Sequence, residues 1–371
     1  MYCKTLAMAT LAFFIGVAFA QEAIDPATAT KGENGILWYN ALDIGLEGKG
    51  WTDTEHPYDR LPSKAKGVVP DPVWSLSHDS AGMAVRFVTD ASAIRARWTV
   101  RDEGLAMPHM PATGVSGLDL YVRGEDGWGW IAQGRPSAVS NEAELVTGIP
   151  EGSHEYLLYL PLYNGTESLE IGIAESATLS EAPARPEGHA KPVLVYGTSI
   201  VHGGCAARPG MAYPAIMGRW LDRPFINLGF SGNGKMEIEM ADLIGELDCA
   251  VYVIDCAPNM APELIAERVV PFVKRLREIE PETPILLVEN IQYQAGWFLP
   301  SRREAYVSKN VEWKKAFDTL QADGVAKLHY FPCDALLGDD HEGTVDGTHP
   351  TDLGFYRMAQ ALEPLVRELC E

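Results

Sequence analysis

Five short apolar runs, separated by segments with helical spacing, occupy the second half of the chain. They cover residues 192–196, 224–228, 250–255, 285–289 and 328–331. Between and after them, apolar residues recur every three or four positions, which indicates amphipathic helices. Strands that are apolar on both faces and alternate with helices predict a parallel sheet covered by helices on both sides. We therefore expect an α/β domain over residues 187–371, with three layers around a five-stranded parallel sheet.

The first half of the chain has a different period. In residues 94–101, apolar side chains alternate with arginine and threonine, which is typical of a strand with one solvent-facing side. The glycine-containing turn at residues 124–127 and the pair Asn164-Gly165 each separate two strand-like runs and predict two hairpins. We expect residues 35–186 to form an all-β antiparallel sandwich. A proline- and alanine-rich linker would join it to the second domain, with the boundary near residue 187.

The N-terminus has the features of a secretory signal peptide. Lys4 precedes an apolar core at residues 6–19 that is too short to span a bilayer, and Ala18-Phe19-Ala20 fits a cleavage site. We expect cleavage after Ala20, a secreted or periplasmic protein, and a loose polar segment at residues 21–34. No other apolar run has the length of a transmembrane helix, so no membrane insertion is expected once the leader is removed.

The charge balance narrows the range of partners. The formal net charge is −21 at pH 7. Nucleic acids and anionic membrane surfaces attract positively charged proteins, so this chain is not expected to bind either. Neutral glycans and small esters are compatible with an acidic protein.

Five cysteines follow the leader, so at least one is unpaired within a monomer. Cys249 and Cys256 bracket one of the apolar runs, and seven strand residues span roughly 23 Å, which is too far for a disulfide. A pair between Cys205 and Cys256 remains open, but burial as small apolar side chains is favoured. The cysteine spacings do not resemble a zinc site, and we expect no metal or organic cofactor.

A serine stands just after the first apolar run, in Gly197-Thr198-Ser199. A serine hydroxyl becomes a nucleophile only when a base removes its proton. Asp346 and His349, three residues apart before the last helix, could supply an oriented imidazole. The alternatives are local: Ser199 could cap the first helix, and the Asp346–His349 pair could cap the last one.

Two further segments could stabilise a developing oxyanion. Gly232 lies in a glycine-rich stretch after the second strand, where backbone N–H groups can approach a ligand closely. Asn259 follows the third strand and carries a side-chain amide donor. The carboxyl ends of parallel strands meet at one edge of a sheet, so Ser199, Gly232, Asn259 and the Asp346–His349 pair are expected at a single rim.

These segments resemble the four sequence blocks of the SGNH (GDSL-type) hydrolases. The resemblance covers residues 192–369 and implies a flavodoxin-like fold, with Ser199 as nucleophile, His349 as general base and Asp346 as the orienting acid. The backbone N–H groups of Ser199 and Gly232 and the Asn259 amide would then form the oxyanion hole. Thr198 replaces the aspartate of Gly-Asp-Ser-Leu, which is not the triad acid. The third block lacks its usual flanking Gly and Asp, so Asn233 is an alternative donor.

The first half resembles the companion domain of one subgroup of this family. Its hallmark Gly-x-Asp-Leu-Tyr stands at residues 117–121, and the resemblance implies a jelly-roll-like sandwich ahead of a bacterial carbohydrate esterase or deacetylase. We therefore expect a secreted serine esterase that removes O-acetyl groups from an oligosaccharide or polysaccharide. The alternatives are a simple carboxylester hydrolase or lipase of the same fold and a glycan-binding protein with an inactive hydrolase domain.

Three residues outside the triad are candidates for substrate contact. They are His109, in an unusual loop before the hallmark, Asn233, and Trp297, in a connection rich in aromatic residues. A structural role is the alternative for His109, and a packed loop or a subunit contact is the alternative for Trp297.

Overall fold

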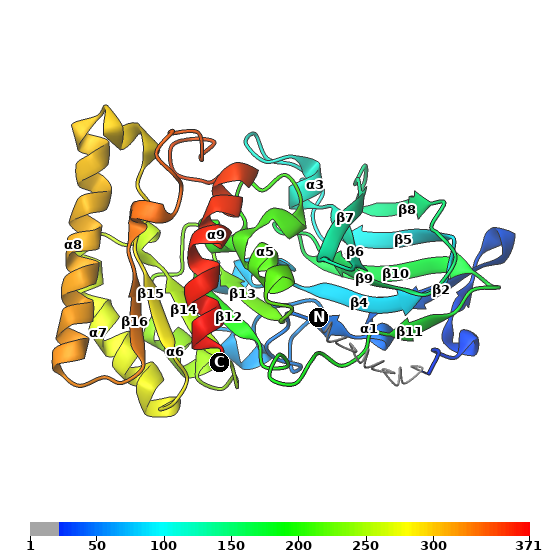
Figure 1. The fold of residues 1–371 in the computed structure, drawn as a ribbon, viewed down its shortest axis with the longest axis horizontal. Coiled ribbons are helices and arrows are strands. Elements are labelled where there is room, and N and C mark those ends of the chain that lie inside the picture. Colours follow the sequence, from blue (N-terminus) through cyan, green and yellow to red (C-terminus); the bar gives the residue numbers. More distant parts are fainter. Residues whose placement is uncertain (1–21) are drawn as a thin grey trace, which may run out of the picture.

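The computed structural model describes residues 22–371, so the predicted signal peptide lies outside the described residues. Two bodies lie side by side, an α/β domain and a β-sandwich (Figure 1). Within residues 22–371, no helix combines the length and apolar character that a bilayer crossing requires.

The α/β domain is built on a parallel sheet whose strand order is β13-β12-β14-β15-β16. The strands are β12 (Val193–Gly197), β13 (Phe225–Gly229), β14 (Val251–Asp255), β15 (Ile285–Val288) and β16 (Leu328–Phe331). All five predicted strands are confirmed to within two residues at each end. β13 lies beside one edge of β12, and β14 lies beside the other edge, so the direction in which strands are added to the sheet reverses after β13. In open α/β sheets such a reversal of direction creates a crevice at the carboxyl ends of the strands.

Helices cover both faces of this sheet, as predicted. On one face lie α5 (Tyr213–Trp220) and α9 (Asp352–Leu369), and on the other lie α6 (Ile238–Ile244), α7 (Pro262–Ile279) and α8 (Pro300–Ala322) (Figure 1). Successive residues of β12 point to opposite faces. Val193 and Val195 pack in the apolar cluster with α5 and α9, whereas Leu194 and Tyr196 pack in the one with α6, α7 and α8. This explains why the strand is apolar throughout.

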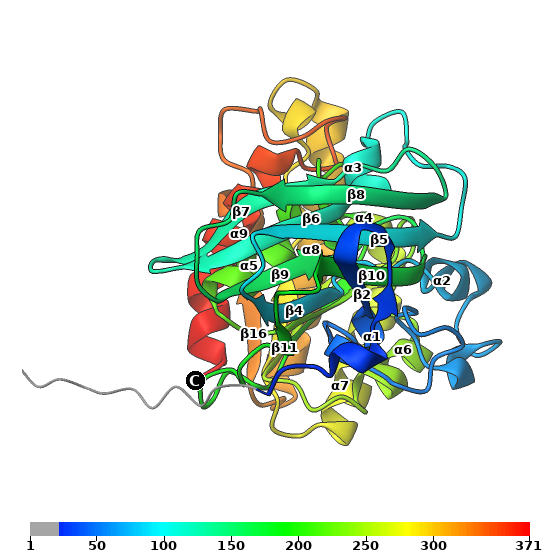
Figure 2. The same cartoon turned by 90° about the vertical axis from the view of Figure 1, so that its right-hand side faces the viewer.

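The sandwich consists of two antiparallel sheets, seen from its far end in Figure 2. One has the order β1-β2-β10-β5-β8, and the other has the order β11-β4-β9-β6-β7 with β3 beside β4. Their bounds are β1 (Thr30–Lys31), β2 (Ile36–Asn40), β3 (Leu46–Glu47), β4 (Ala84–Thr89), β5 (Ala93–Val100), β6 (Leu118–Gly124), β7 (Gly127–Gly134), β8 (Ser140–Thr147), β9 (His154–Tyr159), β10 (Thr166–Ala174) and β11 (Leu179–Glu181). The predicted strand at residues 94–101 corresponds to β5, and the first predicted hairpin is the pair β6 and β7.

The second predicted hairpin is wrong. The strands on either side of Asn164-Gly165 belong to different sheets, since β9 pairs with β4 and β6 while β10 pairs with β2 and β5. Asn164 is fully buried, and its side chain exchanges hydrogen bonds with the backbone N–H (2.9 Å) and C=O (3.0 Å) of Asp102. The asparagine therefore fixes a crossing between the two sheets rather than a tight hairpin turn.

Two other expectations also need correction. Residues 22–34 are not loose along their whole length, because β1 pairs with β2 and Ala23 forms a bridge with Ser180. The pairing of Cys205 with Cys256 is not formed, and all five cysteines of the described chain are free thiols. The Cys256 side chain is buried beneath the sheet with its sulfur 3.6 Å from the Tyr196 carbonyl oxygen, in an apolar cluster that does not include Cys205.

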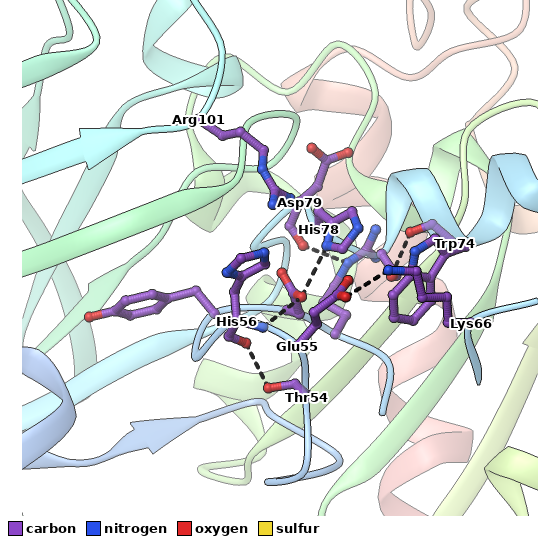
Figure 3. A network of polar contacts seen from close by, with 12 residues as sticks. Thr54, Glu55, His56, Lys66, Trp74, His78, Asp79 and Arg101 are labelled. Atoms are coloured by element: carbon purple, nitrogen blue, oxygen red, sulfur yellow. Dashed lines mark hydrogen bonds and ion pairs between the residues drawn. The ribbon is translucent and has the colours of Figure 1, made fainter. Parts of the chain in front are cut away.

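A long excursion between β3 and β4, residues 48–83, packs against the α/β domain. It contains α2 (Asp71–Leu76), and its apolar residues, among them Trp51, Leu61 and Val73, join the core formed by α6 and α7. Figure 3 shows polar contacts that shape it, including the 2.7 Å ion pair between Glu55 and Lys66. A segment that precedes the predicted boundary at residue 187 therefore completes the core of the α/β domain.

Candidate active site

The turn after β12 presents Ser199 at the carboxyl edge of the sheet. Ser199 opens the short helix α4 (Ser199–His202), but the residue that caps this helix is Thr198, whose hydroxyl accepts a 3.3 Å hydrogen bond from the Ile200 N–H. The Ser199 hydroxyl is therefore not used as a cap. Gly197 is required here because a Cβ atom would lie 2.2 Å from the Asp255 carbonyl oxygen.

Ser199, His349 and Asp346 form a continuous hydrogen-bonded chain. The Ser199 Oγ lies 2.9 Å from His349 Nε2, and His349 Nδ1 lies 2.7 Å from Asp346 Oδ2. A proton on Nδ1, held by the carboxylate, leaves Nε2 free to accept the serine proton. The last helix is capped by Thr351, whose hydroxyl accepts a hydrogen bond from the Gly354 N–H. Neither Asp346 nor His349 is used for that purpose.

Asp346 is held as a carboxylate. Its Oδ1 accepts hydrogen bonds from the backbone N–H groups of Thr348 (3.0 Å) and His349 (2.8 Å). Partial burial alone would raise the pKa of Asp346, but these hydrogen bonds and the one from the His349 ring outweigh it and lower the pKa to about 2. The group that orients His349 is thus ionised over the whole neutral and mildly acidic range.

The loop after β13, one of the segments expected to carry oxyanion donors, lies beside the turn that carries Ser199. Gly234 packs so closely on Gly197 that a Cβ atom would lie 2.0 Å from the Gly197 carbonyl oxygen, and Phe230 N–H donates to the same oxygen at 2.9 Å. Gly232 has a positive φ of 69° and space for a side chain, so its conformation rather than crowding favours glycine. The loop after β13 is thus held against the end of β12, and the role of the Gly232 backbone N–H as an oxyanion donor stays a prediction.

Asn259 ends the short 3₁₀ turn after β14, at residues Ala257–Asn259. Its Nδ2 donates one hydrogen bond to the Asn233 carbonyl oxygen at 2.8 Å, which fixes the amide and leaves its second hydrogen available. The Asn233 side chain is occupied locally, because its Nδ2 donates to the Ser231 carbonyl oxygen at 2.9 Å. Each amide donates one hydrogen bond to a backbone carbonyl oxygen, so this geometry does not distinguish them, and the choice of Asn259 over Asn233 as side-chain donor stays a prediction.

The two other candidates for substrate contact differ in their surroundings. His109 is exposed and comes from the sandwich domain, in the loop before α3 (Ala112–Val115), yet its ring meets the His349 ring edge-on with centroids 5.9 Å apart. Trp297 is 67% exposed and stacks on His341, with centroids 5.3 Å apart. The structure thus brings His109 beside His349, whereas contact of either His109 or Trp297 with a substrate stays a prediction.

The hallmark Gly-x-Asp-Leu-Tyr links the two domains. The Asp119 carboxylate is fully buried and accepts three 2.8 Å hydrogen bonds, from Arg208, the Gly210 N–H and the Trp130 indole. Tyr121 also bonds Arg208. Because Arg208 and Gly210 lie in the segment after α4, the motif holds the part of the chain that follows the Ser199 helix.

Two residues that support the site are not apparent from the sequence. Arg60, from the excursion, is buried and donates to the carbonyl oxygens of Asn227 (3.1 Å) and Gly229 (2.7 Å) at the end of β13. Tyr163, from the sandwich, donates to the Ser199 carbonyl oxygen at 3.3 Å. Neither belongs to a recognisable motif, because each acts through contacts with backbone atoms far away in the chain.

Both domains are similar to known protein families. Residues 190–367 match the model of the GDSL-like lipase/acylhydrolase family, and residues 36–179 match that of the N-terminus of SGNH hydrolase-type esterases. A crystal structure described as a GDSL-like lipase from Bacteroides ovatus is 37% identical, covers 90% of this chain and 98% of its own, and superposes with a TM-score of 0.85. The chain belongs to the GDSL-like lipase/acylhydrolase family.

More distant structures share the fold of this family member. A salicylyl-acyltransferase from a tetracycline biosynthetic pathway is 19% identical, with coverage of 93% of this chain and 96% of its own and a TM-score of 0.68. A family two carbohydrate esterase from Clostridium thermocellum, solved with cellohexaose, is 15% identical, with coverage of 78% and 92% and a TM-score of 0.55. A search of curated proteins gave no match.

Proposed function

We propose that this protein is a serine esterase that removes acyl groups, O-acetyl groups above all, from carbohydrate. The observation that carries the proposal is the hydrogen-bonded chain from Ser199 Oγ through His349 to Asp346, with distances of 2.9 and 2.7 Å. That chain lies at the carboxyl edge of a parallel sheet, in a member of a lipase/acylhydrolase family.

In the proposed reaction, His349 Nε2 takes the proton from Ser199 as Oγ attacks the ester carbonyl carbon. Asp346 holds the ring and stabilises the imidazolium that forms. His349 then gives the proton to the leaving alcohol oxygen as the acyl–oxygen bond breaks. A water molecule, activated by the same base, attacks the acyl-enzyme and releases the carboxylic acid. No step requires a metal or an organic cofactor.

The negative charge on the tetrahedral oxygen would be stabilised by three donors. These are the backbone N–H groups of Ser199 and Gly232 and the free hydrogen of the Asn259 amide. The Asn259 amide is already oriented by its 2.8 Å bond to the Asn233 carbonyl oxygen. A donor that is positioned before the reaction needs no reorganisation in the transition state.

The acetylated carbohydrate is proposed as substrate on three grounds. Carbohydrate esterases share this fold, the acidic chain does not favour polyanionic partners, and exposed aromatic side chains at Trp297 and Phe298 suit stacking on sugar rings. We also propose that the protein is exported, on the basis of Lys4, the apolar core at residues 6–19 and the small residues before Gln21.

The test compares the wild-type protein with Ser199→Ala on p-nitrophenyl acetate and on a panel of acetylated polysaccharides. We expect the wild type to release acetate and Ser199→Ala to lose nearly all activity. Equal rates of acetate release by the two proteins would contradict the esterase proposal. A preference for long-chain esters would indicate a lipase instead, and glycan binding without acetate release would indicate an inactive hydrolase domain.

A further inference from the structure

Three potential metal ligands lie close together, and one of them is His349 of the candidate active site. One nitrogen of His109, the sulfur of Cys205 and one nitrogen of His349 all lie within 4.8 Å of one another. They come from the loop before α3, the loop after α4 and the loop before α9. The three residues are far apart in the sequence, so no spacing pattern indicates the group.

The geometry identifies the nitrogen that His349 would offer. Nδ1 is bonded to Asp346 at 2.7 Å, so the ligand atom is Nε2, the atom that faces Ser199. Histidines that bind metal ions commonly donate their other ring N–H to a carboxylate, which fixes the ring and raises its basicity. The Asp346–His349 pair therefore has the arrangement of a metal ligand with its supporting carboxylate.

Cys205 is held in an unusual way beside this pair. It is buried, it has no disulfide partner, and its φ of +76° lies in the left-handed region that residues with a Cβ atom seldom adopt. Such conformations concentrate at functional sites. A thiol that binds a metal ion does so as the thiolate, because the cation displaces its proton.

His109 provides the third ligand from the other domain. Its ring is exposed and approaches the His349 ring edge-on, with centroids 5.9 Å apart. Zinc–nitrogen and zinc–sulfur bonds of about 2.0–2.3 Å place tetrahedral ligand atoms about 3.3–3.6 Å apart. The three ligand atoms therefore have to approach one another by at most about 1.5 Å, and the exposed His109 on its loop has the freedom to move that far.

We propose that His109, Cys205 and His349 bind a borderline-soft divalent cation of the Zn²⁺ type, and that this binding blocks the active site reversibly. Two imidazoles and one thiolate suit such an ion. The thiol releases its proton to solvent as the metal–sulfur bond forms, and the fourth position is open to water or to Ser199 Oγ. The blocking effect rests on the proposed esterase function, because the ion occupies the Nε2 atom that serves as the base.

Metal binding is tested first, without reference to activity. The full-length protein is freed of metal with EDTA and dialysed, then titrated with Zn²⁺ by calorimetry and with Co²⁺ by absorption spectroscopy. We expect one equivalent to bind and a thiolate-to-cobalt charge-transfer band to appear. Cys205→Ser is expected to abolish the band, and both Cys205→Ser and His109→Ala are expected to weaken Zn²⁺ binding at least about 10-fold.

Cys370→Ser serves as the matched control, because Cys370 is another free thiol of the described chain and lies at the end of α9. It is expected to bind both ions as the wild type does. Absence of Zn²⁺ binding below millimolar concentration, or binding that is unchanged in Cys205→Ser and His109→Ala, would overturn the site.

The regulatory effect is tested with p-nitrophenyl acetate, with a blank that contains Zn²⁺ and no enzyme. We expect Zn²⁺ to inhibit the wild type and EDTA to restore its activity. Cys205→Ser is expected to keep the basal rate and resist inhibition. Equal inhibition of Cys205→Ser and wild type would overturn the proposal. If even the metal-free wild type has no activity, the esterase proposal fails, while the Co²⁺ spectrum still decides whether the site exists.

Discussion

The ring of Tyr163 stacks on the ring of His202 with centroids 3.9 Å apart and planes inclined by only 11°. The two residues belong to different domains, since Tyr163 follows β9 of the sandwich and His202 ends the helix that starts at Ser199. The neighbouring Leu162 carbonyl oxygen lies 2.6 Å from His202 Nε2. The sandwich is thus in direct contact with both ends of the helix that begins at Ser199.

Tyr163 is accordingly predicted to position the nucleophile. Tyr163→Ala removes the stacking on His202 and the 3.3 Å bond to the Ser199 carbonyl oxygen. We expect kcat to fall by about 10²-fold, because small displacements of reacting groups have large effects on rate, while KM changes little. Tyr163→Phe keeps the stacking and is expected to retain most of the activity. Steady-state kinetics on p-nitrophenyl acetate measures both, and a loss confined to KM would contradict the positioning role.

The two asparagines near the rim give a second prediction. Asn259→Ala removes the oriented amide, and we expect kcat to fall by about 10²–10³-fold. Asn233→Ala is the control, since its amide bonds only the Ser231 carbonyl oxygen while its backbone carbonyl still holds Asn259. A reduction of less than about 10-fold is expected there. If the larger loss is found in Asn233→Ala instead, the donor is Asn233.

Asp119 provides a prediction about the contact between the domains. Burial raises the pKa of Asp119, but Arg208 and the three hydrogen bonds counteract this effect. Asp119→Asn removes the charge that compensates Arg208, and loss of one partner of a buried ion pair costs about 3–5 kcal/mol. We expect a lower free energy of unfolding in urea and a lower kcat, because the loop after α4 loses its anchor.

A matched control for Asp119 is Asp248→Asn. Asp248 is paired with Lys191, but 73% of its side chain is exposed, and exposed ion pairs contribute little to stability. The urea midpoint of this variant is expected to equal that of the wild type. If Asp119→Asn behaves in the same way, the hallmark motif does not hold the two domains together.

The parallel sheet and its rim could be predicted because their causes are local. Strands such as β12 and β14 are buried on both faces, so they are apolar along almost their whole length, with Asp255 at the end of β14 as the exception. The carboxyl ends of parallel strands share one edge, so the positions of Ser199, Gly232 and Asn259 just after β12, β13 and β14 predict that they lie along that edge. The roles of these residues in catalysis remain predictions until they are tested.

What the sequence did not reveal depends on contacts between distant segments. The pair Asn164-Gly165 has the composition of a hairpin turn, and only the burial of Asn164 against Asp102 shows that it connects two sheets. Arg60 donates hydrogen bonds to backbone carbonyl groups of β13. Every residue has such a carbonyl group, so the sequence of β13 does not indicate that Arg60 binds there. The loop that carries His109 stands out in the sequence. The approach of the His109 ring to His349, however, depends on how the sandwich is placed against the α/β domain.

Asp255 provides a prediction about the pH dependence of stability. It ends β14, is almost completely buried, and accepts a 2.9 Å hydrogen bond from the Tyr213 hydroxyl. Burial raises the pKa of Asp255 from 3.8 to about 7, although the bond from Tyr213 lowers it. Between these two values the unfolded chain is ionised while the folded protein retains the proton, so stability falls as pH rises from about 4 to 7 and is constant above that range.

Asp255→Asn abolishes this dependence, because an amide does not titrate. The stability of the variant relative to wild type is therefore expected to improve between pH 4 and pH 8, by at most about 4 kcal/mol for a shift of about three pKa units. Urea unfolding at several pH values measures it. Asp126→Asn, which removes an exposed carboxylate in the β6–β7 turn, controls for the loss of a charge. A difference between Asp255→Asn and wild type that stays constant across this range would show that Asp255 is ionised in the folded protein throughout.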